Sequence, residues 1–395
     1  MWVIRSRAWQ ALVAGALGVR LAVVELTRGY IPEHDDRSYL RHAIALERTG
    51  AYPVYHVAGH VVPTAYRAPA FPLMLALAHA VLSGGVEHER IAQALVGAAL
   101  VGLVGVVSAE IWPLRTALAA TALAALSPAL VVFGASLISE PLFAALELAA
   151  VACALRARDR PRWALAAGGL AGAAALTRPE GLAVALGVAL CAGGRRAAAL
   201  VLVATALCVA PWTIRNALVL HAFVPVSTEA GNTLAGTYNS VSARAGALWH
   251  DPRAADVYPA VRAAHRGDEA GTDRALLAAV ARWVAHHPLY PARVAFENGK
   301  RLAGLAPTSF SAGSLHVVSL PSSPAPAIRV GLLAATALAL AGACTAAARR
   351  APPGWWLAGV AVALAAVLVN AEQRFTVPLQ AWLAPLGALA VTRGR

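Results

Sequence analysis

The chain has 395 residues, of which 59% are hydrophobic and 13% are charged, and its mean hydropathy is +0.61. These values exclude soluble, disordered, fibrous and disulfide-scaffold proteins and indicate an integral membrane protein. Since about 20 apolar residues cross the hydrocarbon core once, roughly ten crossings would use half of the chain. One sizeable region would then remain outside the membrane.

The formal net charge of +13 comes from 32 arginines and one lysine, Lys300, set against 20 acidic residues. A basic chain can bind nucleic acid, but most of these arginines stand at the ends of apolar runs, where they indicate membrane topology. The 4 cysteines fall inside apolar segments, so we expect them to pack as small hydrophobic residues. The charge therefore favours the lipid bilayer as partner and not nucleic acid.

The pattern of apolar segments predicts an all-α integral membrane protein with about ten transmembrane helices. The fifth and sixth segments are short and flank a polar break at residues 177–180, where we expect the chain to turn back. The predicted segments are 9–26, 91–111, 116–135, 141–155, 163–176, 182–192, 197–214, 330–348, 355–370 and 376–391.

The distribution of arginine between alternate connections predicts the orientation. If the N-terminus is cytoplasmic, that side receives 13 arginines and one acid, Asp159. Both termini are therefore expected in the cytoplasm. The predicted regions are an N-terminal membrane catalytic module (1–215, about seven spans, with an outer loop at 27–90), a long outer loop (216–327) and a C-terminal membrane segment (328–395, about three spans).

Residues 68–83 form an apolar run that does not fit this count, because a crossing there would move every later arginine cluster to the other side. We therefore predict an outer juxtamembrane or re-entrant helix. In the long outer loop, residues 272–286 and 290–302 carry apolar residues at spacings of three and four with basic residues between them. This pattern predicts amphipathic helices on the membrane surface. A stretch rich in Ser and Pro, 319–326, leads back into the bilayer.

Ionisable groups of both signs gather at the predicted outer ends of the spans, whereas the inner face is almost free of acids. One such group alone could simply be solvated, but nine together predict a polar cavity at the outer membrane level. The groups are Asp35, Asp36, Arg67, Glu140, Arg178, Glu180, Arg215, Glu372 and Arg374.

Two adjacent acids, Asp35 and Asp36, open a predicted short helix over residues 36–46. Asp35 could only cap this helix, a common role for aspartate. Its carboxylate could instead take a proton from a hydroxyl as a general base. The spacing leaves both interpretations open.

The other charged groups also have alternative interpretations. Arg67 could hold a phosphate through its fork of donors, or bind a lipid headgroup without catalysis. Arg215 and Arg374 could contribute to the cavity or serve as ordinary interfacial anchors. Deeper in the fourth span, we expect Glu147 to pair with Arg20 and to have a packing role.

We predict no cofactor. The 12 histidines lie outside the apolar segments without the spacing of metal ligands, and the acids give no clear support for a divalent metal. An outward cavity with an acid and arginines suits a sugar donor that has crossed the bilayer on a polyprenyl phosphate. The arginines would offset the charge on the leaving phosphate, and the aspartate would deprotonate an acceptor hydroxyl. One displacement of this kind inverts the anomeric carbon.

Six short motifs follow one another in a specific order. They are Asp35-Asp36-x-x-Tyr39, Tyr66-Arg67-x-Pro69, Ser139-Glu140-Pro141, Thr177-Arg178-Pro179-Glu180-Gly181, Pro211-Trp212-x-x-Arg215-Asn216 and Glu372-x-Arg374-Phe375. Their order resembles that of the C-type membrane glycosyltransferases over nearly the whole chain, with protein mannosyltransferases and aminoarabinose transferases as the nearest branch. The large C-terminal soluble domain of some oligosaccharyl-transferring relatives is not part of the resemblance.

The resemblance implies juxtamembrane helices in the first outer loop and roles for individual residues. The family's catalytic base matches Asp35, Asp36 stands where Glu is usual, and the family's second acidic position matches Glu140. Arg67 lies near the position of a Lys that contacts the donor phosphate in some members. We therefore predict Asp35, Asp36 and Glu140 as catalytic residues, and as residues that bind the donor phosphate or substrate Tyr39, Arg67, Arg178, Glu180, Arg215, Glu372 and Arg374.

The predicted function is transfer of a monosaccharide from a polyprenyl-phosphate donor to a hydroxyl of a lipid, glycan or protein in the cell envelope. The bias toward Arg and Ala is typical of a high-GC bacterial genome, so we expect the bacterial cytoplasmic membrane, with the active site outward. Two alternatives stay open: a transporter or flippase of lipid-linked saccharides, and a polymerase or ligase that uses a lipid-linked oligosaccharide. Against a transporter, the sequence shows no inverted repeat with paired broken helices.

Overall fold

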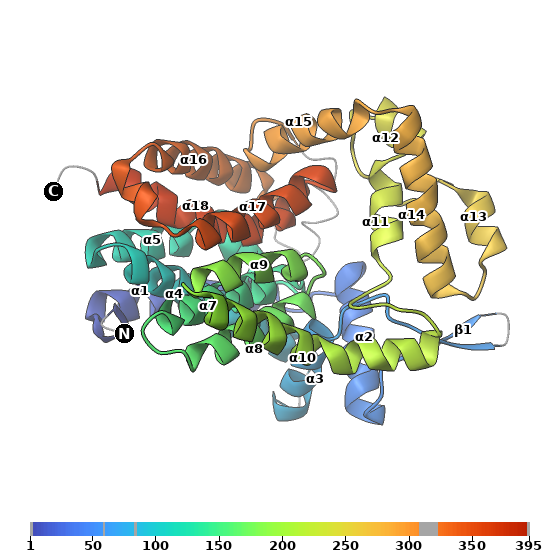
Figure 1. Ribbon diagram of the computed structural model, residues 1–395, viewed down its shortest axis with the longest axis horizontal. Coiled ribbons are helices and arrows are strands. Elements are labelled where there is room, and N and C mark those ends of the chain that lie inside the picture. Colours follow the sequence, from blue (N-terminus) through green and yellow to red (C-terminus); the bar gives the residue numbers. More distant parts are fainter. Residues whose placement is uncertain (1–2, 58–59, 83–84, 308–322, 393–395) are drawn as a thin grey trace.

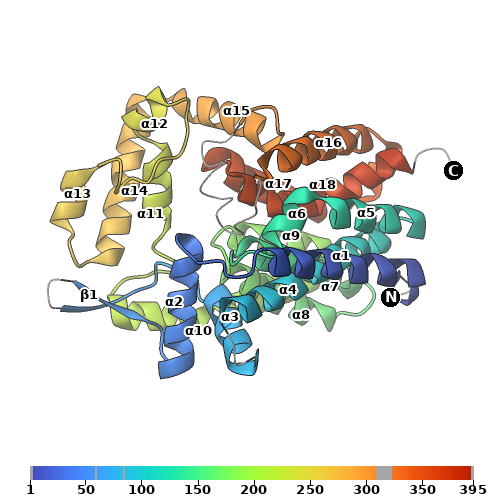
Figure 2. The same ribbon diagram turned by 180° about the vertical axis from the view of Figure 1, so that it is seen from behind.

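The computed structural model describes residues 3–57, 60–82, 85–307 and 323–392, which are helical apart from one hairpin and connecting loops (Figures 1 and 2). The apolar bundle contains α1 (Arg7–Leu26), α4 (Val86–Ile111), α5 (Leu114–Leu126), α6 (Pro128–Phe133), α7 (Glu140–Ala157), α8 (Trp163–Ala175), α9 (Gly181–Cys191), α10 (Arg195–Leu220), α16 (Ala325–Ala343), α17 (Pro353–Leu368) and α18 (Thr376–Val391). Short 3₁₀ turns flank it at η1 (Val3–Arg5), η3 (Ala346–Arg350) and η4 (Gln373–Phe375).

The remaining elements lie at one end of this bundle. They are α2 (Asp35–Thr49), the antiparallel strands β1 (Val54–Val57) and β2 (His60–Pro63), α3 (Ala70–Leu82), α11 (Ala230–Thr237), α12 (Ser240–Arg244), α13 (Pro259–Ala264), α14 (Glu269–His286) and α15 (Tyr290–Leu302). The start of α1 and the end of α18 lie together at the opposite end, on the left of Figure 1 and the right of Figure 2. The fold thus separates the two chain ends from the hairpin and from α11 to α14.

Four of the described helices, α1, α4, α10 and α16, are long and apolar enough to cross a membrane. Others are shorter, and α8 and α9 have only 13 and 11 residues. These two helices pack against each other, so the chain turns back at the polar break between them, as the sequence predicts. The chain is an integral membrane protein with a helical bundle, and the number of crossings stays a prediction.

One predicted segment does not form a single helix, and a second forms a short helix. The segment 116–135 is not one helix, because α5 ends at Leu126 and α6 begins at Pro128, where proline cannot donate the hydrogen bond that would continue α5. The run 68–83 forms α3, whose 13 residues span only about 20 Å at 1.5 Å per residue. That length is below the roughly 30 Å of a hydrocarbon core, as a juxtamembrane helix requires.

The long region between α10 and α16 has a small core of its own, in which Tyr238, Leu276 and Tyr290 are buried. The amphipathic segments predicted at 272–286 and 290–302 form α14 and α15, and α15 packs on α17. Half of the predicted stretch rich in Ser and Pro, residues 319–322, lies outside the described residues.

The predicted pair of Arg20 and Glu147 does not form. The Arg20 guanidinium donates instead to the carbonyl oxygens of Ala16 and Leu130, both at 2.8 Å. Glu147 accepts a hydrogen bond from the Trp382 indole at 3.2 Å. Both side chains are fully buried, so each satisfies part of its polarity through the neighbour that packing brings closest.

Gly342 allows α16 and α18 to approach closely, because a Cβ added there would lie 1.7 Å from the carbonyl oxygen of Leu386. We expect Gly342→Ala to force these helices apart and to lower stability by about 2 kcal/mol. Thermal unfolding of the detergent-solubilised protein measures this change. Gly15→Ala is the matched control, since nothing lies within 4 Å of a Cβ there. Equal melting temperatures for the two variants would contradict the close-packing role of Gly342.

Candidate active site

A cavity of about 390 Å³ lies where the ends of several bundle helices meet α2 and the start of α11. Its walls combine apolar side chains of α17, such as Val362 and Ala366, with a dense set of charged groups. The charged residues are Asp35, Arg67, Glu140, Arg178, Glu180, Glu229, Asp251, Arg253, Glu372 and Arg374. They come from seven separate parts of the chain, so the cavity exists only in the folded protein.

The first turn of α2 directs two adjacent acids to different places. His34 is the N-cap of this helix, so the alternative that Asp35 caps it is wrong. Asp36 is 1% exposed, and its carboxylate accepts a hydrogen bond from the backbone N–H of His34 at 2.7 Å. Asp35 instead lines the cavity, with a side chain that is 32% exposed.

Both oxygens of the Asp35 carboxylate are engaged by guanidinium groups. Oδ1 accepts a hydrogen bond from Arg67 Nη2, and Oδ2 accepts one from Arg374 Nη1 at 2.6 Å. Burial raises the pKa of Asp35, but the two guanidiniums lower it by more and hold it well below its ordinary value. The carboxylate is therefore charged at neutral pH.

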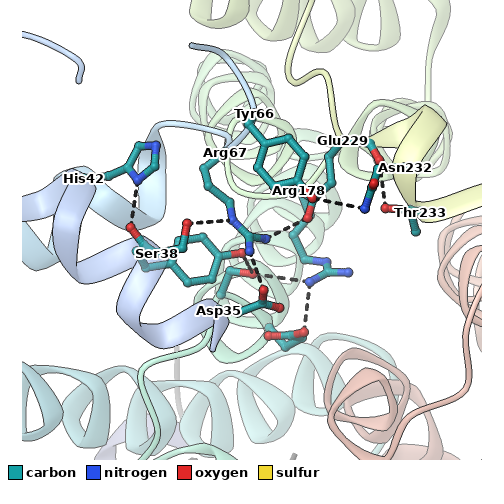
Figure 3. A network of polar contacts seen from close by, with 12 residues as sticks. Asp35, Ser38, His42, Tyr66, Arg67, Arg178, Glu229, Asn232 and Thr233 are labelled. Carbon is teal, nitrogen blue, oxygen red and sulfur yellow. Dashed lines mark hydrogen bonds and ion pairs between the residues drawn. The ribbon is translucent and has the colours of Figure 1, made fainter. Parts of the chain in front are cut away.

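Arg67 is fixed on several sides, as Figure 3 shows. Its Nη1 donates to Glu229 Oε1 at 2.7 Å, and its guanidinium lies 4.7 Å and 5.2 Å from the ring centres of Tyr39 and Tyr66. The side chain is only 6% exposed. Arg67 thus connects Asp35, in the segment between α1 and α4, with Glu229, in the segment between α10 and α16.

Acids and arginines also alternate around Glu140. Glu140, at the start of α7, lies 3.0 Å from Arg178 Nη1 and 3.7 Å from Arg374 Nε. Arg178 Nε donates to Glu180 at 2.5 Å, and Arg374 Nε donates to Glu372 at 3.0 Å. Burial raises the pKa of Glu372 although Arg374 opposes that change. The five groups form one continuous ionic network with Asp35 and Arg67.

The cavity carries an excess of negative charge when every group is ionised. Six carboxylates and four guanidiniums line it, which leaves two negative charges unbalanced. Burial also raises the pKa of Glu229, despite the opposing guanidinium of Arg67. Glu229 and Glu372 therefore hold a proton more readily than isolated glutamates do, whereas Asp35 does not.

Most of the residues predicted from sequence meet at this cavity. Its lining includes Asp35, Tyr39, Arg67, Glu140, Arg178, Glu180, Glu372 and Arg374. The lining does not include Asp36 or Arg215. Arg215 donates to the carbonyl oxygen of Thr64 at 2.7 Å and lies over the rings of Tyr52 and Trp212. These contacts are those of an anchor between α10 and the segment that joins α2 to α3.

Sequence reasoning missed Glu229, the acid that completes the bridge through Arg67. It stands in a run of small and polar residues before α11, where an acid at a helix start is common and carries no sign of a distant partner. Sequence reasoning also missed Asp251 and Arg253, because charged residues in a loop between short helices carry no sign of a distant partner either. Only the tertiary fold identifies these residues as part of the cavity.

The described part of the chain contains no group of three or more His, Cys, Asp and Glu side chains placed to hold one metal ion. Guanidiniums instead separate the carboxylates of the cavity from one another. Successive ion pairs link Glu229, Arg67, Asp35, Arg374 and Glu372 in that order.

No protein-family model and no curated protein matches the sequence. Among solved structures, the apo oligosaccharyltransferase of Archaeoglobus fulgidus aligns with a TM-score of 0.58 and 16% identity over 97% of this chain and 50% of that one. The A. fulgidus oligosaccharyltransferase AglB in complex with an inhibitory peptide and a dolichol-phosphate aligns with a TM-score of 0.52 and 16% identity over 98% of this chain and 51% of that one.

A third similar structure is ArnT from Cupriavidus metallidurans bound to undecaprenyl phosphate, with a TM-score of 0.47 and 17% identity over 97% of this chain and 77% of that one. The chain spans about half the length of the oligosaccharyltransferases that it matches. At 16% identity, these alignments establish a similar fold and nothing about activity. The resemblance predicted from sequence is confirmed at that level: the chain has the fold of the C-type membrane glycosyltransferases.

Proposed function

We propose that the protein is a membrane glycosyltransferase that moves a sugar from a polyprenyl-phosphate-linked donor to an acceptor hydroxyl. The observation that carries this proposal is the position of Asp35 between Arg67 and Arg374 in a cavity next to an apolar groove. A carboxylate supplies a base for the hydroxyl, and guanidiniums supply positive charge for a leaving phosphate.

The apolar groove has a volume of about 640 Å³ and suits the tail of such a donor. It runs between α9, α14 and α17, and among the described residues Glu180 is the one charged residue in its lining. Four residues line both the groove and the cavity: Glu180, Leu234, Ala365 and Val369. A molecule with an anionic head and a long hydrocarbon tail could place its head in the charged cavity and its tail in the adjoining apolar groove.

In the proposed reaction, Asp35 takes the proton of the acceptor hydroxyl while the acceptor oxygen attacks the anomeric carbon. The bond from that carbon to the phosphate oxygen breaks, and its electron pair stays on the phosphate. Arg67, Arg178 and Arg374 then stabilise the additional charge of the phosphate. A single displacement inverts the anomeric carbon, and no cofactor takes part in this scheme.

We also propose that the cavity faces outward, with both termini in the cytoplasm and the acceptor in the cell envelope. The arginine distribution along the chain supports this orientation. A lipid-linked oligosaccharide is the second candidate donor, because two matched structures are oligosaccharyltransferases and one holds a dolichol-phosphate. The acceptor can be a lipid, a glycan or a protein.

The proposal is tested by transfer in proteoliposomes that contain radiolabelled polyprenyl-phosphate monosaccharides, lipid-linked oligosaccharides and a membrane extract as acceptor. Label that moves into lipid, glycan or protein only with active protein would support a transferase and identify the donor. Lipid-linked sugar that crosses the bilayer without transfer would contradict the proposal and favour a flippase.

A large side chain placed in the apolar groove is expected to weaken binding of donors with long tails and to leave binding of short-tailed donors unchanged. Ala183 lies exposed in the groove, so Ala183→Trp should raise KM about tenfold for a donor with a full polyprenyl tail, because buried CH₂ groups contribute about 0.8 kcal/mol each. KM for a short-tailed analogue should stay unchanged. Leu207→Trp, at a 68% exposed position on α10, is the control. Equal effects on both donors would argue against tail binding in the groove.

A further inference from the structure

The ionic network that surrounds Asp35 poses a problem for the proposed reaction. A general base needs a free lone pair within reach of the hydroxyl and a pKa near the working pH. Both oxygens of Asp35 are bound to guanidiniums, and its pKa is held well below the ordinary value. In this state Asp35 is a weak base, so the arginines must change partners before it can accept a proton.

Building on the proposed function, we propose that the donor phosphate activates the base, and that Glu229 is the positioning residue for this exchange. The phosphate replaces Asp35 as the partner of Arg67 and Arg374, which frees the Asp35 carboxylate for the acceptor hydroxyl. Glu229 keeps Arg67 within reach of both anions. Without donor, the Asp35 carboxylate is bound to both arginines and is a weak base. With donor bound, the carboxylate is free to accept the proton of the acceptor hydroxyl.

The contacts of Arg67 explain how the exchange occurs without a large movement. Glu229 holds Nη1, and Ser38 lies 3.4 Å from Nε, while the rings of Tyr39 and Tyr66 flank the guanidinium. Only Nη2 points to Asp35. A phosphate oxygen that enters the cavity can therefore compete at this one edge, with the rest of Arg67 fixed.

Glu229 faces charged groups from several elements. Arg67 lies nearest, and Asp35, Arg178 and Arg374 act on it from across the cavity. Its negative charge disfavours a further negative charge on Asp35, and it also draws Arg67 away from Asp35. Loss of this charge therefore leaves Asp35 more tightly held by Arg67 and leaves the cavity less anionic.

The exchange fits the charge balance of the proposed reaction. The donor is a phosphodiester with one negative charge, and the released carrier is a phosphate monoester with up to two. The proton from the acceptor hydroxyl remains on Asp35 when the carbon–phosphate oxygen bond has broken. Protonated Asp35 no longer competes for Arg67 and Arg374, so both guanidiniums stay with the product phosphate while its charge is greatest.

A structural role of Glu229 needs a separate control, because its segment also packs against the segment that contains Arg67. Glu269 supplies that control. Its carboxylate accepts hydrogen bonds from Thr64 Oγ1 at 2.7 Å, from the N–H of Ala65 at 2.8 Å and from Thr228 Oγ1 at 2.6 Å, and no arginine pairs with it in the described structure. Glu269→Gln therefore weakens the same loop contact without touching Arg67.

The test combines carrier binding with turnover, and undecaprenyl phosphate is the binding probe. If Asp35 competes with phosphate, Asp35→Asn should bind the probe about tenfold more tightly than the wild type. In Glu229→Gln the loss of a negative charge from the cavity should outweigh the firmer hold of Asp35 on Arg67, so the probe should bind about threefold to tenfold more tightly. Transfer of sugar should nevertheless be about tenfold slower. The acidic limb of its kcat profile should move to lower pH, since Asp35 is held more firmly as the carboxylate.

The control outcomes separate this inference from the proposed function. Glu229→Asp should restore part of kcat, and Glu269→Gln should not produce opposite changes in affinity and turnover. Unchanged affinity in Asp35→Asn, or a parallel loss of affinity and kcat in Glu229→Gln, would overturn phosphate activation while leaving the glycosyltransferase proposal intact. Failure of the wild type to bind undecaprenyl phosphate would overturn both.

Discussion

Asp35→Asn is expected to lower the rate of sugar transfer by about 10²- to 10⁴-fold, the usual contribution of a general base. The amide cannot take the proton of the acceptor hydroxyl, but asparagine has nearly the same size and shape as aspartate and should not disturb the packing of the site. Carrier binding should become about tenfold tighter, because the substitution frees Arg67 and Arg374 for phosphate. The initial rate of label transfer in proteoliposomes measures the first effect, and titration with undecaprenyl phosphate measures the second.

The adjacent acid provides a matched control for this prediction. Asp36 is buried, lies outside the cavity lining and accepts a hydrogen bond from the N–H of His34, which an asparagine can also accept. Asp36→Asn should therefore retain most of the transfer rate, with a modest loss of thermal stability. Normal turnover in Asp35→Asn together with inactive Asp36→Asn would assign the base to the other acid.

The parts of the fold that sequence predicted well are those with local determinants. Residues 290–302 form α15 with the predicted bounds, because an apolar stripe at helical spacing defines both its face and its length. The break near Pro179 is equally local, since proline disfavours a continuous helix there. By contrast, the partners of Arg20 depend on which of several apolar helices pack beside α1, and composition does not encode that choice.

The same distinction applies to the site. Motifs near Asp35, Arg67 and Arg374 could be located in the sequence because charged residues at the ends of apolar segments are conspicuous. Their pairing could not be predicted, since Asp35 and Arg374 are separated by 339 residues along the chain. Glu229 gave no local signal at all. Its role follows only from the close approach of two distant segments of the chain at Arg67.

The second large effect is expected at Arg374, which lies among three carboxylates. Its guanidinium contacts Asp35 at 2.6 Å, Glu372 at 3.0 Å and Glu140 at 3.7 Å. Arg374→Ala should lower kcat/KM by about 10³-fold, because removal of one donor to a developing oxyanion costs about 10²- to 10³-fold and the site also becomes more anionic. Arg374→Lys keeps the charge without the planar fork and should lose about tenfold to 100-fold.

Loss of Arg374 also leaves a buried carboxylate without its partner, so misfolding could mimic a catalytic defect. The double variant Arg374→Ala/Glu372→Gln separates these effects, since it removes one positive and one negative charge and restores the balance of the network. It should melt close to the wild type and bind undecaprenyl phosphate weakly, with transfer still impaired. Recovery of full transfer in this double variant would mean that Arg374 only neutralises Glu372. Persistent inactivity in a stable protein would mean that its guanidinium acts on the donor phosphate.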